Sequence, residues 1–393
     1  MESAYLFSPT PESVKALREK LQLSQEEFAA RLGVSFSTVN RWENGHVAPK
    51  KLALFRLEKL AQEASGTVSS NEGEGSSGRL KDFLVVGVRD RLLFLDPGET
   101  ARPFETARIV QLPNDLGPLR SVSVAKLHGR DVLLAGMRDG VLVLPPQRNP
   151  AITRFSFGMY RGRGLGTNAA CIAHGCLYAT HSEHGLWRWP IGEPTSPERL
   201  FKDQLASAKT VRGIALMRSD VLMFCADAKL YRFEKGSEAP EPFFETGEAA
   251  RLVGAVVHDH TVYVASSEGR VFAWDLIFQR TNPLHSFESA HLYSANLSRC
   301  LGNPVLVLGM KKPFVTVVAL GEEEERTLYR CGSTDVRVAV ATDQHVVACD
   351  HGQSSLLVWE AERPEMPVST LDIERKLSHQ IQDLATIRLP ENW

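Results

Sequence analysis

The hydrophobic residues of the chain follow two different periods, and the period changes near residue 65. In the first part, Val14, Leu17 and Leu21 recur at the i, i+3, i+7 spacing of an amphipathic helix. From about residue 80 onward, short apolar runs with a period of two indicate β-strands. The sequence therefore predicts a helical segment followed by a much longer all-β segment.

Helix start and stop signals place the helices of the first part. Ser24 and Glu27 stand three residues apart in the pattern of a capping box, which begins a helix. This pattern predicts a helix over residues 25–32 and, after a turn marked by glycine, a second over residues 36–44. A proline then opens a further predicted helix over residues 50–64.

A segment without core-forming residues separates the two parts. Residues 65–78 read SGTVSSNEGEGSSG, and this composition predicts a flexible linker with a typical reach of roughly 20 Å. The chain is thus divided into a domain of residues 1–64, the linker, and a domain of residues 79–393. Its length of 393 residues agrees with more than one domain, because a single hydrophobic core rarely grows that large.

A repeat of strand, short polar turn and strand runs through residues 79–393. Its seven copies begin 40–49 residues apart, at residues 82, 131, 175, 220, 260, 303 and 344. A period of this length is typical of the blades of a β-propeller. Further short apolar strands precede several of the hairpins, but none precedes the first hairpin.

The end of the chain supplies the strand that the first hairpin lacks. Residues 381–388 form an apolar strand that no hairpin follows, and its pairing with the first hairpin closes the ring. The expected fold is multidomain, α plus all-β: a helical bundle, a flexible linker and a seven-bladed β-propeller closed by the C-terminal strand. The irregular segment at residue 303 leaves the blade count open by one.

Residues 23–45, LSQEEFAARLGVSFSTVNRWENG, resemble the lambda-repressor-like (Cro-type) helix-turn-helix family, and the resemblance covers about the first 60 residues. It implies a bundle of four to five helices that places the helix of residues 36–44 in the major groove of double-stranded DNA. The residues expected at DNA are Gln25, Ser35, Phe36, Ser37, Thr38, Asn40, Arg41, His46, Lys50 and Lys51. The alternative is a helical bundle used only for protein contacts.

The resemblance assigns base contacts to Phe36, Ser37 and Arg41, with Asn40 as a further candidate. An arginine can bond bidentately to guanine O6 and N7, and an asparagine can pair with adenine. Two roles remain open for Phe36, which either contacts a thymine methyl group or packs beneath its own helix.

The other expected contacts are to the DNA backbone. The resemblance directs Gln25 to a phosphate, and Lys50 and Lys51, with His46, are placed to hold the backbone beyond the helix of residues 36–44. Each of these cations is equally explained as a solvated surface residue.

Two further residues match structural positions of the family. Arg18 and Glu43 correspond to an ion pair that braces the first helix against the helix of residues 36–44, so both are expected to be structural.

Charge limits how tightly one copy can hold DNA. The net charge of the chain is −2, and residues 1–64 contain nine Lys/Arg against eight Asp/Glu. A domain with so small an excess neutralises few phosphates, so tight binding needs a dimer on two half-sites. Leu52, Phe55 and Leu60 are a candidate partner face, with packing inside the domain or on the propeller as the alternative.

No arrangement of catalytic groups stands out, so we expect no enzyme, cofactor or metal. A cluster of Cys and His residues in one predicted hairpin lacks the spacing of a common zinc site; its members are Cys171, His174, Cys176, His181 and His184. The six cysteines are scattered without a CxxC pair, and neither a signal sequence nor a membrane-spanning run is present. These features predict a cytoplasmic protein with reduced thiols and no membrane partner.

The predicted propeller offers two functional signals. The hairpins that end VFAWDL and LLVWEAE resemble the Trp-Asp end of WD repeats, although the Gly-His half is missing. Arg212 and Arg337 occupy matching positions of two predicted inner strands, with Arg120 near the same level. They either make one mouth of the channel basic or are scattered surface arginines.

Three hypotheses of function follow from these features. The first is a sequence-specific DNA-binding protein, a bacterial transcriptional regulator whose propeller binds a protein partner or an effector. The second is an adaptor without regulatory function that tethers a complex, of the defence or mobile-element type, to DNA. The third is a propeller enzyme with a DNA-binding anchor.

Overall fold

The computed structural model divides the chain into two compact units, Met1–Gly78 and Arg79–Trp393. The structure describes residues 10–47, 49, 57 and 80–390, with gaps at 22, 33–35, 100–106, 148–149, 159–165, 182–184, 202–210, 218–219, 226–227, 235, 246–250, 277–279, 288–290, 321–325, 333–334, 351, 353 and 374–379. The division falls at the C-terminal end of the predicted linker. The linker itself lies outside the described residues, as does the predicted helix of residues 50–64 apart from Leu57.

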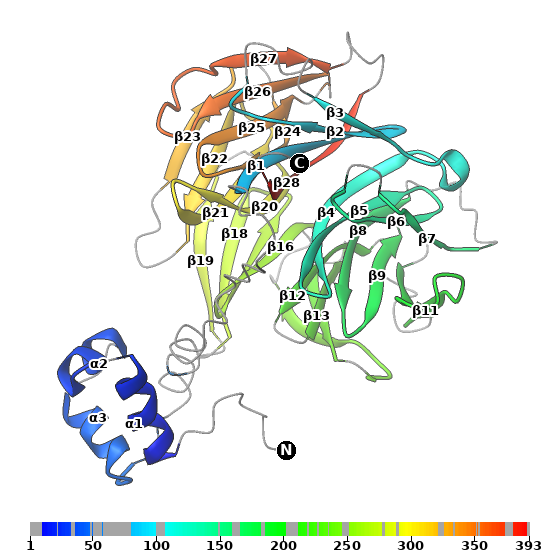
Figure 1. Ribbon diagram of the computed structural model, residues 1–393. Helices are drawn as coiled ribbons and strands as arrows, with labels where there is room; N and C mark the ends of the chain where they lie inside the picture. Colours follow the sequence, from blue (N-terminus) through cyan, green and yellow to red (C-terminus); the bar gives the residue numbers. More distant parts are fainter. Residues whose placement is uncertain are drawn as a thin grey trace. The chain divides into compact units, whose positions relative to one another are not determined.

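The first unit contains three described helices, α1 (Pro11–Lys20), α2 (Gln25–Leu32) and α3 (Phe36–Glu43) (Figure 1). Each places its apolar residues three or four positions apart, so that one face of each helix meets the others. The resulting core consists of Val14, Leu17, Phe28, Ala29, Val39, Trp42 and Leu57. The described helices agree with the expected bundle, while any further helix lies outside the described residues.

Local sequence determines where α2 begins. The Ser24 backbone N–H donates to Glu27 Oε2 (2.8 Å), and the Glu27 N–H donates to Ser24 Oγ (3.2 Å). This reciprocal pair satisfies two N–H groups that the first helical turn leaves without partners. The predicted capping box is therefore confirmed, and α2 has the bounds that were expected from it.

The strands of the second unit form seven four-stranded antiparallel sheets within the described residues. The first four sheets, each given from its innermost strand outward, are β28 (Ile381–Pro390), β1 (Leu80–Val88), β2 (Arg91–Leu95), β3 (Arg108–Gln111); β4 (Leu119–Leu127), β5 (Arg130–Met137), β6 (Gly140–Leu144), β7 (Thr153–Ser156); β8 (Thr167–Ala173), β9 (Cys176–His181), β10 (Gly185–Pro190), β11 (Glu198–Leu200); and β12 (Val211–Met217), β13 (Asp220–Cys225), β14 (Lys229–Phe233), β15 (Glu241–Glu245).

The other three sheets follow the same order. They are β16 (Leu252–His258), β17 (Thr261–Ser266), β18 (Arg270–Asp275), β19 (Arg280–Ser286); β20 (Leu292–Cys300), β21 (Asn303–Met310), β22 (Phe314–Ala319), β23 (Arg326–Arg330); and β24 (Val336–Ala341), β25 (His345–Asp350), β26 (Ser355–Glu360), β27 (Ser369–Asp372). The innermost strand of each sheet contacts those of its two neighbours, which arranges the sheets as the blades of a β-propeller (Figure 1).

The C-terminal strand closes the ring. β28 pairs antiparallel with β1 from Leu80↔Pro390 to Val88↔Ile381, so the last strand of the chain becomes the innermost strand of the first sheet. This confirms the closure predicted from residues 381–388. The pairing fixes the two ends of the propeller to each other, and β28 also lies against β4 and β24 of the neighbouring sheets.

Apolar cores between consecutive sheets hold the ring together. Along β25, Val346 and Ala348 face the core shared with the sixth sheet, whereas Val347 and Cys349 face the core shared with the first. Both faces of the sheet are buried, which explains why the strands show nearly continuous apolar runs despite their antiparallel pairing. Equivalent cores lie between every other pair of neighbouring sheets.

The structure adds strands that the sequence pattern did not reveal. β20 (Leu292–Cys300) is the innermost strand of the sixth sheet, and its residues LYSANLSRC alternate too weakly to predict it. The segment at residue 303, which looked irregular, forms an ordinary hairpin of β21 and β22. The outermost strand of each sheet was also missed, because these strands are short and their exposed edges carry polar residues.

We expect Leu384→Ala in β28 to lower the free energy of unfolding of the propeller by about 2–5 kcal/mol, because it empties a buried site in the core that closes the ring. Leu297→Ala is the matched control, since Leu297 of the innermost strand β20 is 42 % exposed. Urea denaturation followed by far-ultraviolet circular dichroism measures both. Equal effects of the two substitutions would contradict the role assigned to this core.

Candidate DNA interface and propeller surfaces

The exposed face of α3 contains four of the ten residues expected at DNA. Phe36, Ser37, Asn40 and Arg41 are exposed, Thr38 is half-buried, and Val39 and Trp42 of the same helix are buried in the core. The exposed positions recur at i, i+1, i+4 and i+5, which places them on one side of the helix. The buried residues thus anchor α3 while its other side remains available for a ligand.

Phe36 lies at the first position of α3, and its side chain is 47 % exposed. It does not belong to the apolar core of the unit. Phe36 thus lies outside the described core, and both of its expected roles, contact with a thymine methyl group and packing beneath its own helix, stay predictions. An aromatic ring exposed at the start of a helix agrees with contact to an apolar group of a ligand, such as a thymine methyl group.

Asn40 has a neighbour that the sequence reasoning missed. Asn44, one turn later, donates from Nδ2 to both the side-chain Oδ1 (2.8 Å) and the backbone oxygen (2.7 Å) of Asn40. This bond orients the side-chain amide of Asn40: its Oδ1 faces Asn44, and its Nδ2 faces the opposite way. The signal for this pair was the i, i+4 spacing of the two asparagines in VNRWEN.

Glu43 connects all three helices. Its carboxylate accepts hydrogen bonds from Arg18 Nε (2.7 Å) and Nη2 (3.1 Å) of α1 and from Gln25 Nε2 (2.7 Å) of α2. The side chains of Arg18 and Glu43 are only 14 % and 4 % exposed. The expected ion pair is therefore present, and its bidentate geometry fixes the position of α3 relative to α1.

One donor of the Gln25 side chain is used in this network. Its amide nitrogen donates to Glu43, which leaves its second N–H for any other acceptor. The same bond holds the amide at the N-terminal end of α2. The expected phosphate contact of Gln25 thus stays a prediction, now with a defined orientation of the donor group.

The ionisation of Glu43 follows from its surroundings. Burial favours the neutral acid, but the hydrogen bonds and charge of Arg18, together with Gln25, outweigh burial and hold the pKa of Glu43 below its usual value. The same contacts raise the pKa of Arg18. Both groups are charged at neutral pH, and each stabilises the charged form of the other.

The remaining expected contacts lie beyond α3 or outside the described residues. His46 is exposed just after α3, and its backbone N–H donates to Arg41 O (2.9 Å). Ser35, Lys50 and Lys51 lie outside the described residues. The backbone contacts assigned to them are therefore not addressed by the structure.

The Cys and His cluster of the third sheet is divided between two cores. Cys171 belongs to the core shared with the fourth sheet, whereas the His181 ring lies edge-on to Phe157, 5.1 Å away, on the side of the second sheet. Alternate residues of a strand face opposite sides, which accounts for this separation. Among the described residues no His, Cys, Asp or Glu group is arranged to hold a metal ion, and His184 lies outside them.

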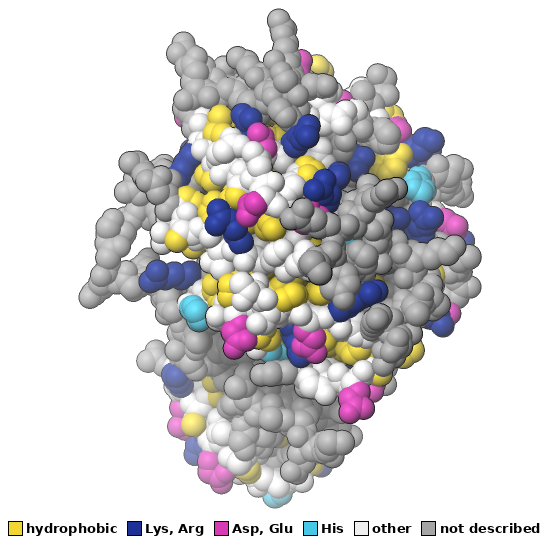
Figure 2. Space-filling view, turned by 90° about the vertical axis from the view of Figure 1, so that its right-hand side faces the viewer, with side chains coloured by type: hydrophobic (Ala, Val, Ile, Leu, Met, Phe, Trp, Pro, Cys, Tyr) yellow, Lys and Arg dark blue, Asp and Glu magenta, His cyan; other side chains and the backbone are white. Residues whose placement is uncertain are grey.

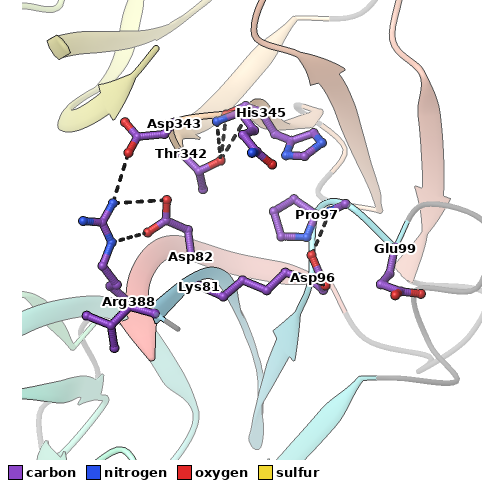
Figure 3. Close-up of a pocket in the computed structure, with 12 residues that line it drawn as sticks. Lys81, Asp82, Asp96, Pro97, Glu99, Thr342, Asp343, His345 and Arg388 are labelled. Atoms are coloured by element: carbon purple, nitrogen blue, oxygen red, sulfur yellow. Dashed lines mark hydrogen bonds and ion pairs between the residues drawn. The ribbon is translucent and has the colours of Figure 1, made fainter. Parts of the chain in front are cut away.

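A polar cavity of about 480 Å³ lies where the first and seventh sheets meet (Figure 3). Arg388 of β28 reaches Asp82 (Nε to Oδ1, 2.9 Å) and Asp343 (Nη2 to Oδ2, 3.1 Å), and Lys81 forms an ion pair with Asp96. Three of the carboxylates that line the cavity are therefore paired with two cations of the same cavity. This arrangement connects the two ends of the ring and is best explained as structural.

The surface drawn in Figure 2 carries charges of both signs. Lys and Arg side chains stand there in small separate groups, with hydrophobic, uncharged and acidic side chains between them. A protein surface that follows the phosphates of a duplex presents a continuous basic stripe instead. The coloured part of this face shows no such stripe.

Comparisons with known proteins agree with the two units. The family model described as Helix-turn-helix matches residues 14–62. This family model is of the Cro/lambda-repressor type. A helix-turn-helix of this type suggests DNA binding. No curated protein sequence matches this chain.

Solved structures resemble the propeller. The computationally designed Ika8 protein matches with a TM-score of 0.51 and 12 % identity, covering 78 % of this chain and 91 % of that one. A chain of a Nidogen/Laminin complex (TM-score 0.48, 10 % identity, 65 % and 97 % covered) and the Cps50 (Swd1) β-propeller domain of Myceliophteria thermophila (0.49, 13 %, 64 % and 87 %) are also similar. At these identities the likeness to Ika8 shows the propeller fold alone.

None of the helices in the described residues is long and apolar enough to cross a bilayer.

Glu43→Gln is expected to destabilise the helix-turn-helix by about 2 kcal/mol at neutral pH, because Arg18 loses its charged partner. The folded-state pKa of Glu43 is lowered, so its contribution is complete above the unfolded value of about 4.3 and disappears as the pH falls through the folded value. Hydrogen exchange of the α1 and α3 amides in the full chain, corrected for intrinsic rates, measures this loss. This pH-dependent loss of stability should be absent in Glu43→Gln and present in the control Glu26→Gln, which changes an exposed carboxylate of α2.

Proposed function

We propose that this protein binds double-stranded DNA sequence-specifically and acts as a transcriptional regulator. The observation that carries the proposal is the exposed face of α3, where Phe36, Ser37, Asn40 and Arg41 stand on a helix anchored by Val39 and Trp42. The second helix of a helix-turn-helix enters the major groove, and its outward side chains contact base edges. Arg41 is assigned to a guanine, and the exposed ring of Phe36 to a thymine methyl group.

The DNA-bound form is proposed to contain two copies of the chain. Residues 1–64 contain nine Lys/Arg and eight Asp/Glu, so one copy neutralises few phosphates. Two copies on half-sites about one helical turn apart combine their contacts on one duplex. Sedimentation of the full chain with and without a selected duplex measures this stoichiometry.

The propeller is proposed to bind a protein partner without catalysis. A propeller suggests protein interaction, and its strands form a rigid scaffold whose loops lie at the two rims. The predicted linker favours recruitment over the transmission of strain, because a flexible tether passes little conformational change between domains. An adaptor that tethers a complex to DNA uses the same two modules. It differs from a regulator in leaving transcription near its binding sites unchanged.

Arg41→Ala is expected to weaken binding to a selected duplex by about 1–3 kcal/mol and to relax the base preference at one position, because a bidentate guanine contact is lost. The duplex comes from selection of bound DNA from a random pool with the full chain, and fluorescence anisotropy measures the affinity. Arg363→Ala in the propeller, at a 72 % exposed arginine, is the control. Identical affinities of the two variants would exclude α3 from base recognition.

Phe36→Ala is expected to weaken DNA binding without lowering the stability of the helical unit, because the ring is exposed and lies outside the core. Val39→Ala, at a fully buried position of the same helix, should instead lower stability by about 1–3 kcal/mol. Hydrogen exchange of the α2 and α3 amides reports stability, and anisotropy reports affinity. A loss of stability in Phe36→Ala would instead favour the role in which Phe36 packs beneath its own helix.

A further inference from the structure

Every innermost strand of the propeller carries a β-bulge at the same level. In each of the seven sheets, the pairing of the innermost strand with its neighbour skips one residue near the beginning of the innermost strand. The skipped residues are Arg120, Asn168, Arg212, Val253, Tyr293, Arg337 and Gln382. Bulges redirect side chains and are common at the rims of barrels and next to binding sites.

These seven positions form one rim around the axis of the propeller. The innermost strands contact each other in succession around the ring, so equivalent positions in them lie at one end of the central channel. Arginine occupies the bulge in the second, fourth and seventh sheets in chain order. Three cations are therefore distributed around the rim as evenly as seven positions allow.

The three arginines have no acidic partner within ion-pair distance in the described part of the chain. The ion pairs found there involve other arginines, such as Arg138 with Asp139. Arg212 and Arg337 are exposed, whereas Arg120 is half-buried. The Nε of Arg120 is shielded from solvent and has no hydrogen-bond partner among the described groups. A buried donor without a partner is costly to keep, which points to a ligand that supplies the acceptor.

The charges nearest to two of these arginines are also positive. Burial, and then the charge of Arg138, lowers the pKa of Arg120. Burial, and then the charge of Arg251, lowers the pKa of Arg212. Arg138 is itself paired with Asp139, but Arg120 and Arg212 have no such partner in the described part of the chain, so a bound anion would compensate their charges.

Two carboxylates lie near the third arginine, Arg337, and both have other interactions. Asp383 of β28 accepts hydrogen bonds from the backbone N–H groups of Val122 and Leu384, each at 2.9 Å. Burial raises the pKa of Asp383 to about 6 despite these bonds and the charge of Arg337. Burial and the charge of Asp335 raise the pKa of Tyr293, which stands at the bulge of the sheet next to that of Arg337, and the charge of Arg337 lowers it. Neither carboxylate forms an ion pair with Arg337 in the described part of the chain, so the Arg337 guanidinium is available to a carboxylate of a ligand.

We propose that this rim binds an acidic segment of a partner protein, with Asp or Glu carboxylates bonded to Arg120, Arg212 and Arg337. A guanidinium binds a carboxylate through two parallel N–H donors. The inference rests on the proposed role of the propeller in binding a protein partner, and it adds the chemistry of that partner.

The arrangement of the cations selects a peptide over nucleic acid. Double-stranded DNA presents its phosphates along a line, whereas these arginines surround one axis. Single-stranded nucleic acid is held mainly by stacking on several aromatic side chains, and Tyr293 is the only aromatic residue among the seven bulge positions. A peptide is narrow enough to place acidic side chains at several points of a ring.

The test uses the full chain and a fluorescein-labelled peptide of alternating Glu and Ser, with fluorescence anisotropy at low and physiological salt. The triple variant Arg120→Ala, Arg212→Ala, Arg337→Ala should lose peptide binding, and each single variant should bind roughly tenfold more weakly. Thermal unfolding monitors the fold. Since Arg212 and Arg337 are exposed, their single variants remain informative even if Arg120→Ala proves unstable.

A matched triple variant controls for net charge. Arg154→Ala, Arg299→Ala and Arg363→Ala remove the same three charges from side chains that are 53 %, 58 % and 72 % exposed. This variant should retain most of the affinity for the peptide. Equal losses in the two triple variants, or no binding of the acidic peptide by the unmodified protein, would overturn the proposal.

Two further measurements separate this proposal from the others. The first is the binding of a single-stranded oligonucleotide. If it binds more tightly than the peptide and depends on the same three arginines, the ligand of the rim is nucleic acid, and the assignment to an acidic peptide is refuted. Binding of the selected duplex should be unchanged in the rim triple variant and reduced in Arg41→Ala. If duplex binding is absent while peptide binding persists, the DNA proposal fails and the rim proposal stands.

Discussion

Burial of apolar surface between neighbouring sheets is the interaction on which the propeller depends. Each sheet is apolar on both faces, so no sheet can be stable in water without a neighbour on each side. A row of such sheets would leave two apolar faces exposed at its ends, and the ring removes both. The contact between the first and seventh sheets is thus of the same kind as the others, formed by residues such as Leu84 and Val347. The pairing of β28 with β1 and the ion pairs of Arg388 then hold the two ends of the chain in register.

The helical unit depends on a different interaction. Its core is small, and one face of α3 must remain outside that core. Val39 and Trp42 contribute apolar contacts, but these alone leave the rotation of a short helix weakly defined. The Glu43 carboxylate fixes the rotation of α3, because it accepts two hydrogen bonds from Arg18 and one from Gln25 in a defined geometry. A nearly buried carboxylate is unfavourable unless its charge is paired, so the network forms as a whole or not at all. The same network therefore makes the orientation of Phe36 and Arg41 a consequence of the fold.

Much of this architecture follows from the sequence, and the exceptions have physical causes. The capping box of Ser24 and Glu27 predicted the start of α2, and the apolar strand at residues 381–388 predicted ring closure, because both depend on local pattern. The strand β20 was missed because its exposed residues, such as Leu297, obscure the alternation. The bulges were missed although a signal exists. In most sheets the bulge residue stands between an apolar and a small residue, as in Leu119-Arg120-Ser121 and Val211-Arg212-Gly213. Only the pairing register shows that these short patterns occupy equivalent positions in the seven innermost strands.

Each of the two proposed binding surfaces carries few positive charges, so each is expected to bind weakly on its own. A helix-turn-helix with a small positive excess binds weakly alone, and three arginines on a rim hold only a short acidic segment. A linker of the flexible kind predicted for residues 65–78 would raise the effective concentration of one weak site at the other to the millimolar range. A partner that itself associates with DNA would then be retained by both contacts together and released when either is lost. The small positive charge of the helical unit favours this arrangement, because a strongly basic helical unit would compete with the rim for the partner's acidic segment.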